Sequence, residues 1–195
     1  MPRHPDPDLE ERILHASDVL WRRGGEKSLT MRAVARAAKT NTPAVYRRFK
    51  DRKDLVKALL LRIANRIGEH FEQGKSIEDM AEAYVEYALK MPHEYELFYS
   101  HARELSPPKG QGRPRPIRES RPNFALVEQL LAKRLGGTPQ DHTQLALEVW
   151  ATLHGTTMLL LQKSIPDGHE EDLREACRAA VKVLLEGAAR SSIQN

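Results

Sequence analysis

The feature that most constrains the fold of this chain is the spacing of its apolar residues, which is helical almost throughout. The pattern opens with Leu9, Ile13 and Ala16, at steps of four and three, as on the buried face of an α-helix. No segment sustains the alternation of a strand, and runs rich in Val, Ile and Thr are absent. A chain of 195 residues is long enough to bury a substantial core. We therefore predict an all-α protein without internal repeats.

Capping and breaking residues mark where the predicted helices begin and end. Glycines at 24–25 end the first helix, and Thr30 and Asn41 are good N-caps for the next two. Pro43 marks a helix start, because its missing N–H would have no helical partner in a first turn. The segment SPPKGQGRPRPI at 106–117 predicts a loop. The predicted helices span about 8–23, 30–38, 41–49, 51–74, 76–91, 94–105, 119–135, 138–163 and 170–186.

Composition restricts the class of protein further. The apolar share of 40% and the charged share of 30% are typical of a soluble globular protein. No apolar run reaches the length of a membrane span, and the first residues form no apolar signal region, so we expect a cytoplasmic protein. The single cysteine, Cys177, cannot form an internal disulfide, and we expect it to be a small buried residue. We predict no metal site and no cofactor.

Positive charge is concentrated in one short region. Residues 27–53 contain nine Lys and Arg against one acidic residue, whereas the rest of the chain is nearly balanced. Such a patch on a neutral body is the charge distribution expected of a protein that binds a nucleic-acid backbone. A solvated basic face is the alternative interpretation.

Two short predicted helices, 30–38 and 41–49, are separated by only a few residues inside this basic region. A pair of this kind, flanked by two further helices, is typical of a helix-turn-helix domain. Val45 and Phe49 would face inward and hold the second helix. A helix fits the major groove of DNA, which is about 12 Å wide, so the outer face of residues 41–49 is predicted to read bases.

The segment LTMRAVARAAKTNTPAVYRRFKDRKDLVKALL resembles the N-terminal domain of the TetR family of transcriptional regulators. The resemblance is strong over residues 9–62 and implies a helix-turn-helix domain in residues 1–55. The helix 51–74 would lead into an effector-binding and dimerisation domain in residues 56–195. The matching positions are Thr30, Val34, Ala35, Asn41, Tyr46, Phe49 and Arg52.

The resemblance also implies which residues contact DNA. Tyr46 would contact phosphate, although a merely packed aromatic is the alternative, and Arg47 would reach a base or a phosphate. The family has a glycine where this chain has Lys39; a left-handed lysine costs about 1 kcal/mol, which a domain tolerates, and adds a cation near DNA. The implied DNA-binding residues are Thr30, Arg32, Lys39, Asn41, Thr42, Pro43, Ala44, Tyr46, Arg47, Arg48 and Arg52.

The C-terminal half resembles a subgroup of the same family with a Trp…His-Gly signature, through EVWATLHGTTMLLLQ and ALKMPHEYELFYS. The resemblance implies an effector pocket and a homodimer formed by the last two helices. His154 is either a hydrogen-bonded core histidine or a polar group in the pocket. The pocket candidates are Tyr95, Phe98, His101, Trp150, His154 and Met158. The dimer candidates are Leu145, Val149, Leu153, Thr156, Leu160, Leu173, Cys177, Val181, Leu184 and Ala188.

Two other classes of function compete with a regulator. An all-α metal enzyme would need Glu-x-x-His pairs, which are absent, as are the common phosphate-binding and nucleophile motifs. An architectural DNA-binding protein without an effector would use the same helix-turn-helix. We predict a homodimeric repressor that binds a pseudo-palindromic DNA operator and is released by a small-molecule effector, and no enzyme. The sequence does not name the operator or the effector, and activation is an open alternative to repression.

Overall fold

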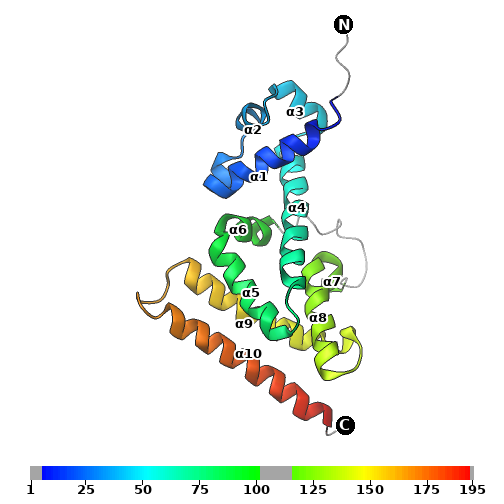
Figure 1. Cartoon of the computed structure of the whole chain (residues 1–195), viewed down its shortest axis with the longest axis vertical. Coiled ribbons are helices and arrows are strands. Elements are labelled where there is room, and N and C mark those ends of the chain that lie inside the picture. The colour runs from blue at the N-terminus through cyan, green and yellow to red at the C-terminus, as the bar shows by residue number, and fades with distance from the viewer. Residues whose placement is uncertain (1–5, 102–115, 194–195) are drawn as a thin grey trace. The chain divides into compact units, whose positions relative to one another are not determined.

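The computed structural model describes residues 6–101 and 116–193 (Figure 1). The described residues form helices joined by short turns, and none of them lies in a strand, which confirms the all-α prediction. The helices are α1 (Leu9–Ser28), α2 (Met31–Ala37), α3 (Thr42–Arg48), α4 (Arg52–Glu72), α5 (Ile77–Lys90), α6 (Pro92–His101), α7 (Ile117–Ser120), α8 (Pro122–Leu135), the 3₁₀ turn η2 (Pro139–His142), α9 (Thr143–Leu161) and α10 (Glu170–Ile193).

The observed boundaries follow the caps. The hydroxyl of Thr30 accepts a hydrogen bond from the backbone of α2, and a capping box of Ser76 and Asp79 opens α5. The Ser76 hydroxyl above all, and then the backbone N–H groups of Lys75 and Ser76, hold the pKa of Asp79 below its usual value. Local chemistry at these positions is therefore enough to fix where α2 and α5 begin.

Several predicted ranges were wrong in detail. The range 119–135 is divided into α7 and α8, and Thr138 caps the turn η2, not the long helix that follows. The last helix continues to Ile193, well past the predicted end at 186. The predicted loop 106–117 lies almost wholly outside the described residues.

The chain divides into two compact units. The first unit comprises Met1–Ile63 and His93–Pro107, and the second comprises Ala64–Pro92 and Pro108–Asn195. From His93 on, the helix α6 thus belongs to the first unit, whereas the sequence prediction placed residues 56–195 in the effector-binding and dimerisation domain. Each unit has its own core. In the first the core includes Ile13, Trp21, Leu29, Val34, Val45 and Leu55, and in the second Ile77, Met80, Leu131, Val149, Leu153 and Leu185.

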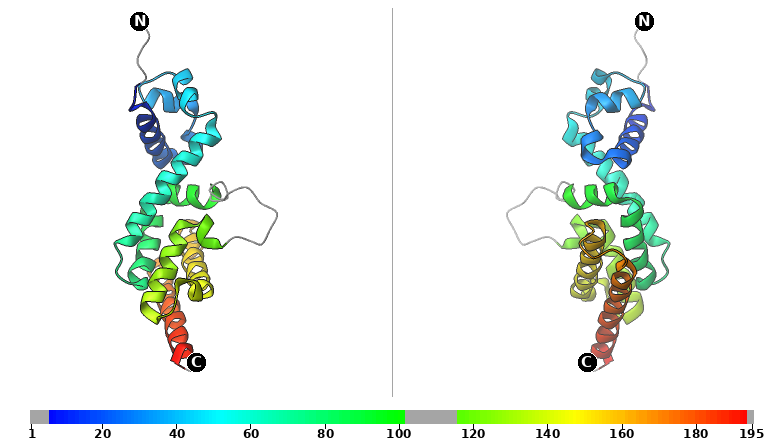
Figure 2. Two further views of the ribbon diagram at one scale, coloured as in Figure 1. Left: turned by 90° about the vertical axis from the view of Figure 1, so that its right-hand side faces the viewer. Right: turned by 90° about the vertical axis from the view of Figure 1, so that its left-hand side faces the viewer.

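The second unit is a bundle in which α9 packs against both α5 and α10. In Figures 1 and 2 the helices α9 and α10 run side by side in opposite directions. Burying one leucine-sized side chain in such a core stabilises the fold by about 1.5–3 kcal/mol. No helix in the described ranges is both long enough and apolar enough to cross a membrane.

Candidate nucleic-acid interface

The helix α3 is held in the first unit by one face and is exposed on the other. Asn41 caps it, with its side-chain oxygen accepting a hydrogen bond from the Ala44 N–H at 2.9 Å. Val45 is fully buried and Phe49 is 4% exposed, so these residues anchor the helix. On the opposite face Tyr46 is 50% exposed, although it is a large aromatic residue. An anchored helix with an exposed aromatic and basic face is suited to enter a DNA groove.

The turn between α2 and α3 contains the left-handed residue that the sequence suggested. Lys39 has φ 54°, in the region that favours glycine. Its N–H donates to the Arg36 carbonyl at 3.2 Å, and the Thr40 N–H donates to the Ala35 carbonyl at 2.9 Å. These two bonds make a Schellman motif, in which the carbonyls at the end of α2 find partners. The motif therefore forms with lysine in place of glycine, and the lysine side chain is exposed.

The structure removes Ala44 from the set of residues that DNA can reach. This residue was predicted to read bases together with Thr42 and Pro43. Ala44 is 3% exposed and packs with Val45 on the inner face of α3. Pro43 is exposed and Thr42 is partly exposed, so these two remain on the accessible side of the helix.

Arg52 is engaged within the first unit. Its guanidinium donates to the Leu29 carbonyl at 2.9 Å and to both the carbonyl and the carboxylate of Glu26 at 3.2 Å. The side chain thereby ties the start of α4 to the end of α1. Its phosphate-binding role was predicted from the family pattern, which gives positions but not the internal partners of an arginine. In this structure its contacts are those of a structural residue.

Asp6 organises two other cations on the same unit. Its carboxylate pairs with Arg12 at 2.6 Å, and its backbone carbonyl accepts a hydrogen bond from Arg48 at 3.1 Å. The Arg12 guanidinium holds the pKa of Asp6 below its usual value. Arg48 remains exposed but has a partner, whereas Arg32 and Arg47 are exposed as predicted. The sequence pattern around Asp6 gave no signal of this long-range contact.

Contacts between α1 and α6 were also missed by sequence reasoning. The Trp21 indole donates to the His93 carbonyl at 2.7 Å, and Arg22 pairs at 2.5 Å with Glu94, which is fully buried. A buried carboxylate is stable only with such a partner. The sequence signal that could have indicated a buried carboxylate is a glutamate followed closely by the apolar residues Tyr95 and Leu97. These contacts join α6 to α1 within the first unit.

Comparison with known proteins agrees with this geometry. A family model described as bacterial regulatory proteins, tetR family, matches residues 13–59, and a model described as tetracyclin repressor-like, C-terminal domain, matches residues 77–184. The second model alone covers more than half of the chain. The chain belongs to the TetR family. No curated protein matches its sequence.

Solved structures share the TetR-family fold over nearly the whole chain. A protein of unknown function from Rhodococcus sp. RHA1 has a TM-score of 0.70 at 21% identity, covering 97% of this chain and 99% of its own. The multidrug binding protein EbrR complexed with ethidium has a TM-score of 0.65 at 20% identity, covering 92% and 99%. A TetR variant from Acinetobacter baumannii AYE in complex with minocycline has a TM-score of 0.60 at 19% identity, covering 97% and 99%.

The six predicted effector residues are divided between the two units of this TetR-family chain. Tyr95, Phe98 and His101 belong to the first unit, where Tyr95 and Phe98 are buried. Trp150, His154 and Met158 lie on α9 in the second unit. The Tyr84 hydroxyl lies 3.4 Å from His154 Nδ1. Burial, and then the nearby charge of Arg121, lower the pKa of His154, which favours its neutral form.

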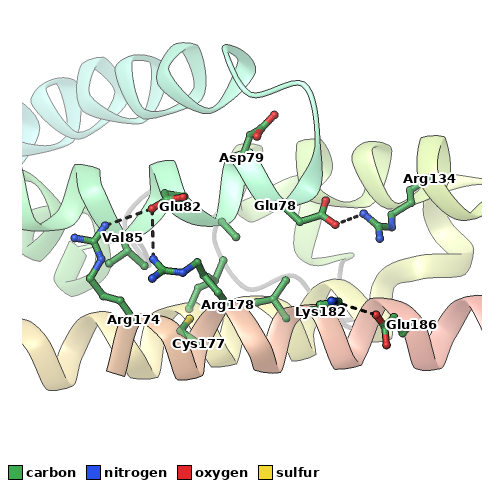
Figure 3. A pocket seen from close by; sticks show the side chains of 13 residues that line it. Glu78, Asp79, Glu82, Val85, Arg134, Arg174, Cys177, Arg178, Lys182 and Glu186 are labelled. Atoms are coloured by element: carbon green, nitrogen blue, oxygen red, sulfur yellow. Dashed lines mark hydrogen bonds and ion pairs between the residues drawn. The ribbon is translucent and has the colours of Figure 1, made fainter. Parts of the chain in front are cut away.

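A groove of about 340 Å³ in the second unit is lined by none of these six residues. It lies along α5 and α10, and its apolar lining includes Val85 and Cys177 (Figure 3), together with Val181. Ion pairs cross its rim, with Glu82 held by Arg174 and by Arg178, each at 3.5 Å. The charges are thus neutralised within the chain. No group of three His, Cys, Asp or Glu in the described part is arranged to hold a metal ion.

Most of the predicted dimer-seam residues are buried inside the single chain and offer no surface to a partner. Leu145, Leu173, Leu184 and Ala188 are partly exposed. The two helices that carry the predicted apolar stripe, α9 and α10, pack against each other and against the chain's own α5 and α8. The buried members are Val149, Leu153, Thr156, Leu160, Cys177 and Val181.

Proposed function

We propose that this TetR-family chain is a sequence-specific transcriptional repressor that binds a pseudo-palindromic operator as a homodimer and is released by a small-molecule effector. The observation that carries the proposal is the exposed face of α3, with Tyr46 and Arg47 on a helix anchored by Val45 and Phe49. An anchored recognition helix presents its side chains in fixed positions, which base reading requires.

The role of each side chain follows from its place. Thr42 and Pro43, at the first turn of α3, would meet base edges, while Arg47 reaches a base or a phosphate. Tyr46 would donate its hydroxyl to a phosphate. Basic side chains on the surface around α3 also attract the DNA phosphates, and this attraction does not depend on the base sequence of the DNA. The remaining candidates for the DNA surface are Thr30, Arg32, Lys39, Asn41 and Arg48.

We propose that the dimer forms through the exposed stripes of α9 and α10, next to the buried residues first predicted. On α9 the stripe is Ala151, Gly155 and Leu159, at steps of four, and Leu159 is 41% exposed. A Cβ added at Gly155 would meet nothing within 4 Å in the chain, so a second helix has room to approach closely. On α10 the stripe is Ala176, Ala180, Val183 and Gly187, with Val183 64% exposed.

A dimer of this kind sets the spacing of two α3 helices. Successive major grooves on one side of DNA are about 34–36 Å apart, so only one arrangement of the subunits fits both half-sites. A second arrangement of the subunits would hold the two α3 helices at a spacing that does not fit both half-sites. An effector that binds this second arrangement more tightly than the first weakens operator binding, by an amount set by the difference between its two affinities. Relatives of the same fold have been crystallised with ethidium and with minocycline, which supports an effector of drug-like size.

The experiment that tests the proposal is selection of bound duplexes from a random DNA pool by the purified full chain. We expect enriched sequences with two half-sites related by two-fold symmetry and centred about one helical turn apart. Recovery of unenriched DNA would contradict the proposal and favour the architectural alternative. Recovery of a single asymmetric half-site would contradict the dimer.

A further inference from the structure

The short segment before α1 brings a carboxylate to the basic part of the first unit. Residues 27–53 contain nine Lys and Arg against one acidic residue. Asp6 lies outside this region in the sequence, yet its backbone carbonyl accepts a hydrogen bond from Arg48, 42 residues further along the chain, at 3.1 Å. Its carboxylate pairs with Arg12 of α1 at 2.6 Å. Because Arg48 is the last residue of α3, these contacts connect the segment before α1 to the proposed recognition helix.

Arg12 also lies beside the turn between α2 and α3. Its Nε is 3.5 Å from the carbonyl oxygen of Ala38, the residue that ends α2, and the next residue is the exposed Lys39. One series of contacts therefore runs from the turn through Arg12 and Asp6 to the end of α3. The sequence did not assign Arg12 to the DNA surface, although its exposed guanidinium lies against the helix-turn-helix.

The Asp6 carboxylate offers the two arginines the same chemistry as a phosphate. A guanidinium donates charge-assisted hydrogen bonds to carboxylates and to phosphates alike, at about 2.7–2.9 Å, and its planar fork fits both. The hydrogen bond from Arg12 above all, with a smaller contribution from the charge of Arg48, lowers the pKa of Asp6. Asp6 is therefore ionised at neutral pH and presents a full negative charge to both cations.

The pair is exposed enough for another anion to displace it. The side chain of Arg12 is 44% exposed and that of Asp6 is 42% exposed. Ion pairs at such positions are screened by salt and contribute little to stability. Double-stranded DNA carries about one phosphate charge per 1.7 Å of its axis, so it competes strongly for an exposed guanidinium. Exchange of Asp6 for a phosphate then costs little, but it still subtracts from the affinity for DNA.

We propose that Arg12 and Arg48 form a further phosphate site of the DNA surface, and that Asp6 occupies this site in the free chain as a competitor which a DNA phosphate displaces. The competition weakens binding to every DNA sequence equally, since phosphate contacts carry no base information. The inference deepens the proposed function and rests on it for the identity of the ligand, double-stranded DNA.

The chain offers a matched pair of variants to test the competitor. Asp6→Asn removes the charge but keeps Oδ1, which accepts a hydrogen bond from the Asp8 N–H at 3.0 Å, so the local turn is retained. The control is Asp8→Asn, which removes the same charge two residues further on. The side chain of Asp8 is exposed and makes no capping hydrogen bond. Any difference between the two variants then reports the contacts of Asp6 and not the net charge of the chain.

The first measurement is the affinity of the full chain for random-sequence duplex DNA at one salt concentration. We expect Asp6→Asn to tighten binding by about fivefold and Asp8→Asn by less than about twofold. Binding to the selected operator should tighten by the same factors, which leaves the specificity ratio unchanged. Equal effects of the two variants would overturn the proposal, and so would an effect of Asp6→Asn confined to the operator.

The second measurement tests whether Arg12 itself takes the phosphate. We expect Arg12→Met to lower the dependence of log K on log salt by about 0.9, as for one lost phosphate contact. In the Arg12→Met background, Asp6→Asn should tighten binding no more than Asp8→Asn does. The control is Arg62→Met, which removes an arginine whose ion pair with Glu11 of α1 is also 2.6 Å long, and it should leave the salt slope unchanged. An unchanged slope for Arg12→Met, or an equal fall for Arg62→Met, would overturn the site.

The two proposals fail separately. If the chain prefers its selected operator as expected but Asp6→Asn and Asp8→Asn act alike, the competitor is wrong and the regulator stands. If Asp6→Asn alone tightens binding to random DNA but no sequence is enriched by selection, the phosphate site stands and the repressor is wrong.

Discussion

At the scale of single residues, the two left-handed lysines show how a local rule can be broken at small cost. Lys39 and Lys163 both have positive φ, 54° and 50°, and both follow the last turn of a helix. Each N–H donates to the carbonyl three residues back, and the next N–H closes the Schellman motif. The same strain therefore occurs once beside the proposed DNA surface and once far along the chain, on the second unit.

This repetition provides a matched pair of variants. We expect Lys39→Gly and Lys163→Gly each to raise the free energy of unfolding by about 0.5–1 kcal/mol, because glycine relieves the left-handed strain at some cost in chain entropy. Only Lys39→Gly should also lower the dependence of log K for operator binding on log salt, by about 0.9 for one lost phosphate contact. Denaturant unfolding and salt titration measure the two effects. An unchanged salt slope for Lys39→Gly would exclude a phosphate contact.

Arg52 and Arg47 test the difference between a structural and a DNA-contacting arginine. We expect Arg52→Ala to lower the free energy of unfolding by about 1 kcal/mol, since its partly exposed guanidinium makes three hydrogen bonds within the first unit. Arg47→Ala should change the free energy of unfolding by no more than about 0.5 kcal/mol, because Arg47 is exposed on the surface. It should weaken operator binding, because the proposed partner of Arg47 is DNA. Chemical denaturation and binding titrations of both variants give the comparison. A stable Arg52→Ala protein with a shallower salt slope would restore the phosphate role.

His154 gives the second unit a pH dependence with a definite sign. Burial and the charge of Arg121 lower the pKa of His154 in the folded chain, so the unfolded chain binds a proton first as pH falls. Its contribution to stability is therefore complete above the ordinary histidine pKa of 6.5 and is lost as pH falls from 6.5 towards the folded value. His154→Gln should flatten the unfolding free energy in that window. An identical pH profile for the variant would contradict the assignment.

At the scale of helices, the sequence predicted the start of an element better than its packing. Thr30, Asn41 and Ser76 cap three helices as their chemistry requires, because a cap involves only the next few residues. Val149 was assigned to the dimer seam, but apolar spacing identifies a buried stripe and does not say what covers it. Ala44 was assigned to DNA from the family pattern, which gives positions but does not say which of them this chain buries. The contacts of Asp6 and Arg52 depend on tertiary approach, which local patterns do not contain.

The contribution of the Asn41 cap of α3 to the free energy of unfolding can be measured. We expect Asn41→Ala to lower the free energy of unfolding by about 1 kcal/mol, because the Ala44 N–H loses its side-chain acceptor and keeps only the Asn41 carbonyl at 3.0 Å. It should also weaken DNA binding, since α3 begins at the surface that we propose meets the major groove. Asn41→Ser retains a capping oxygen and should restore most of the stability. Denaturation midpoints for the two variants provide the measurement, and equal loss in both would show that capping is not the reason.

At the scale of the whole molecule, the proposed dimer depends on a surface that the single chain leaves open. We expect Gly155→Leu to leave each folded subunit intact, because no atom within 4 Å would meet a new Cβ, and to weaken dimerisation by filling the approach. Sedimentation equilibrium of the variant should show a larger monomer fraction at micromolar concentration. Glu69→Leu, which adds the same side chain to an exposed position of α4, should remain dimeric. A dimeric Gly155→Leu protein would place the interface elsewhere.

The central claim is that the exposed face of α3 reads a DNA sequence. It is tested most directly by the ratio of dissociation constants for random duplex DNA and for the selected operator, measured at one physiological salt concentration. A regulator should prefer its operator by at least about 10³-fold, and Arg47→Ala should reduce that ratio more than it reduces binding to random DNA. A preference below about tenfold, unchanged by Arg47→Ala, would contradict sequence reading and indicate an architectural DNA-binding protein.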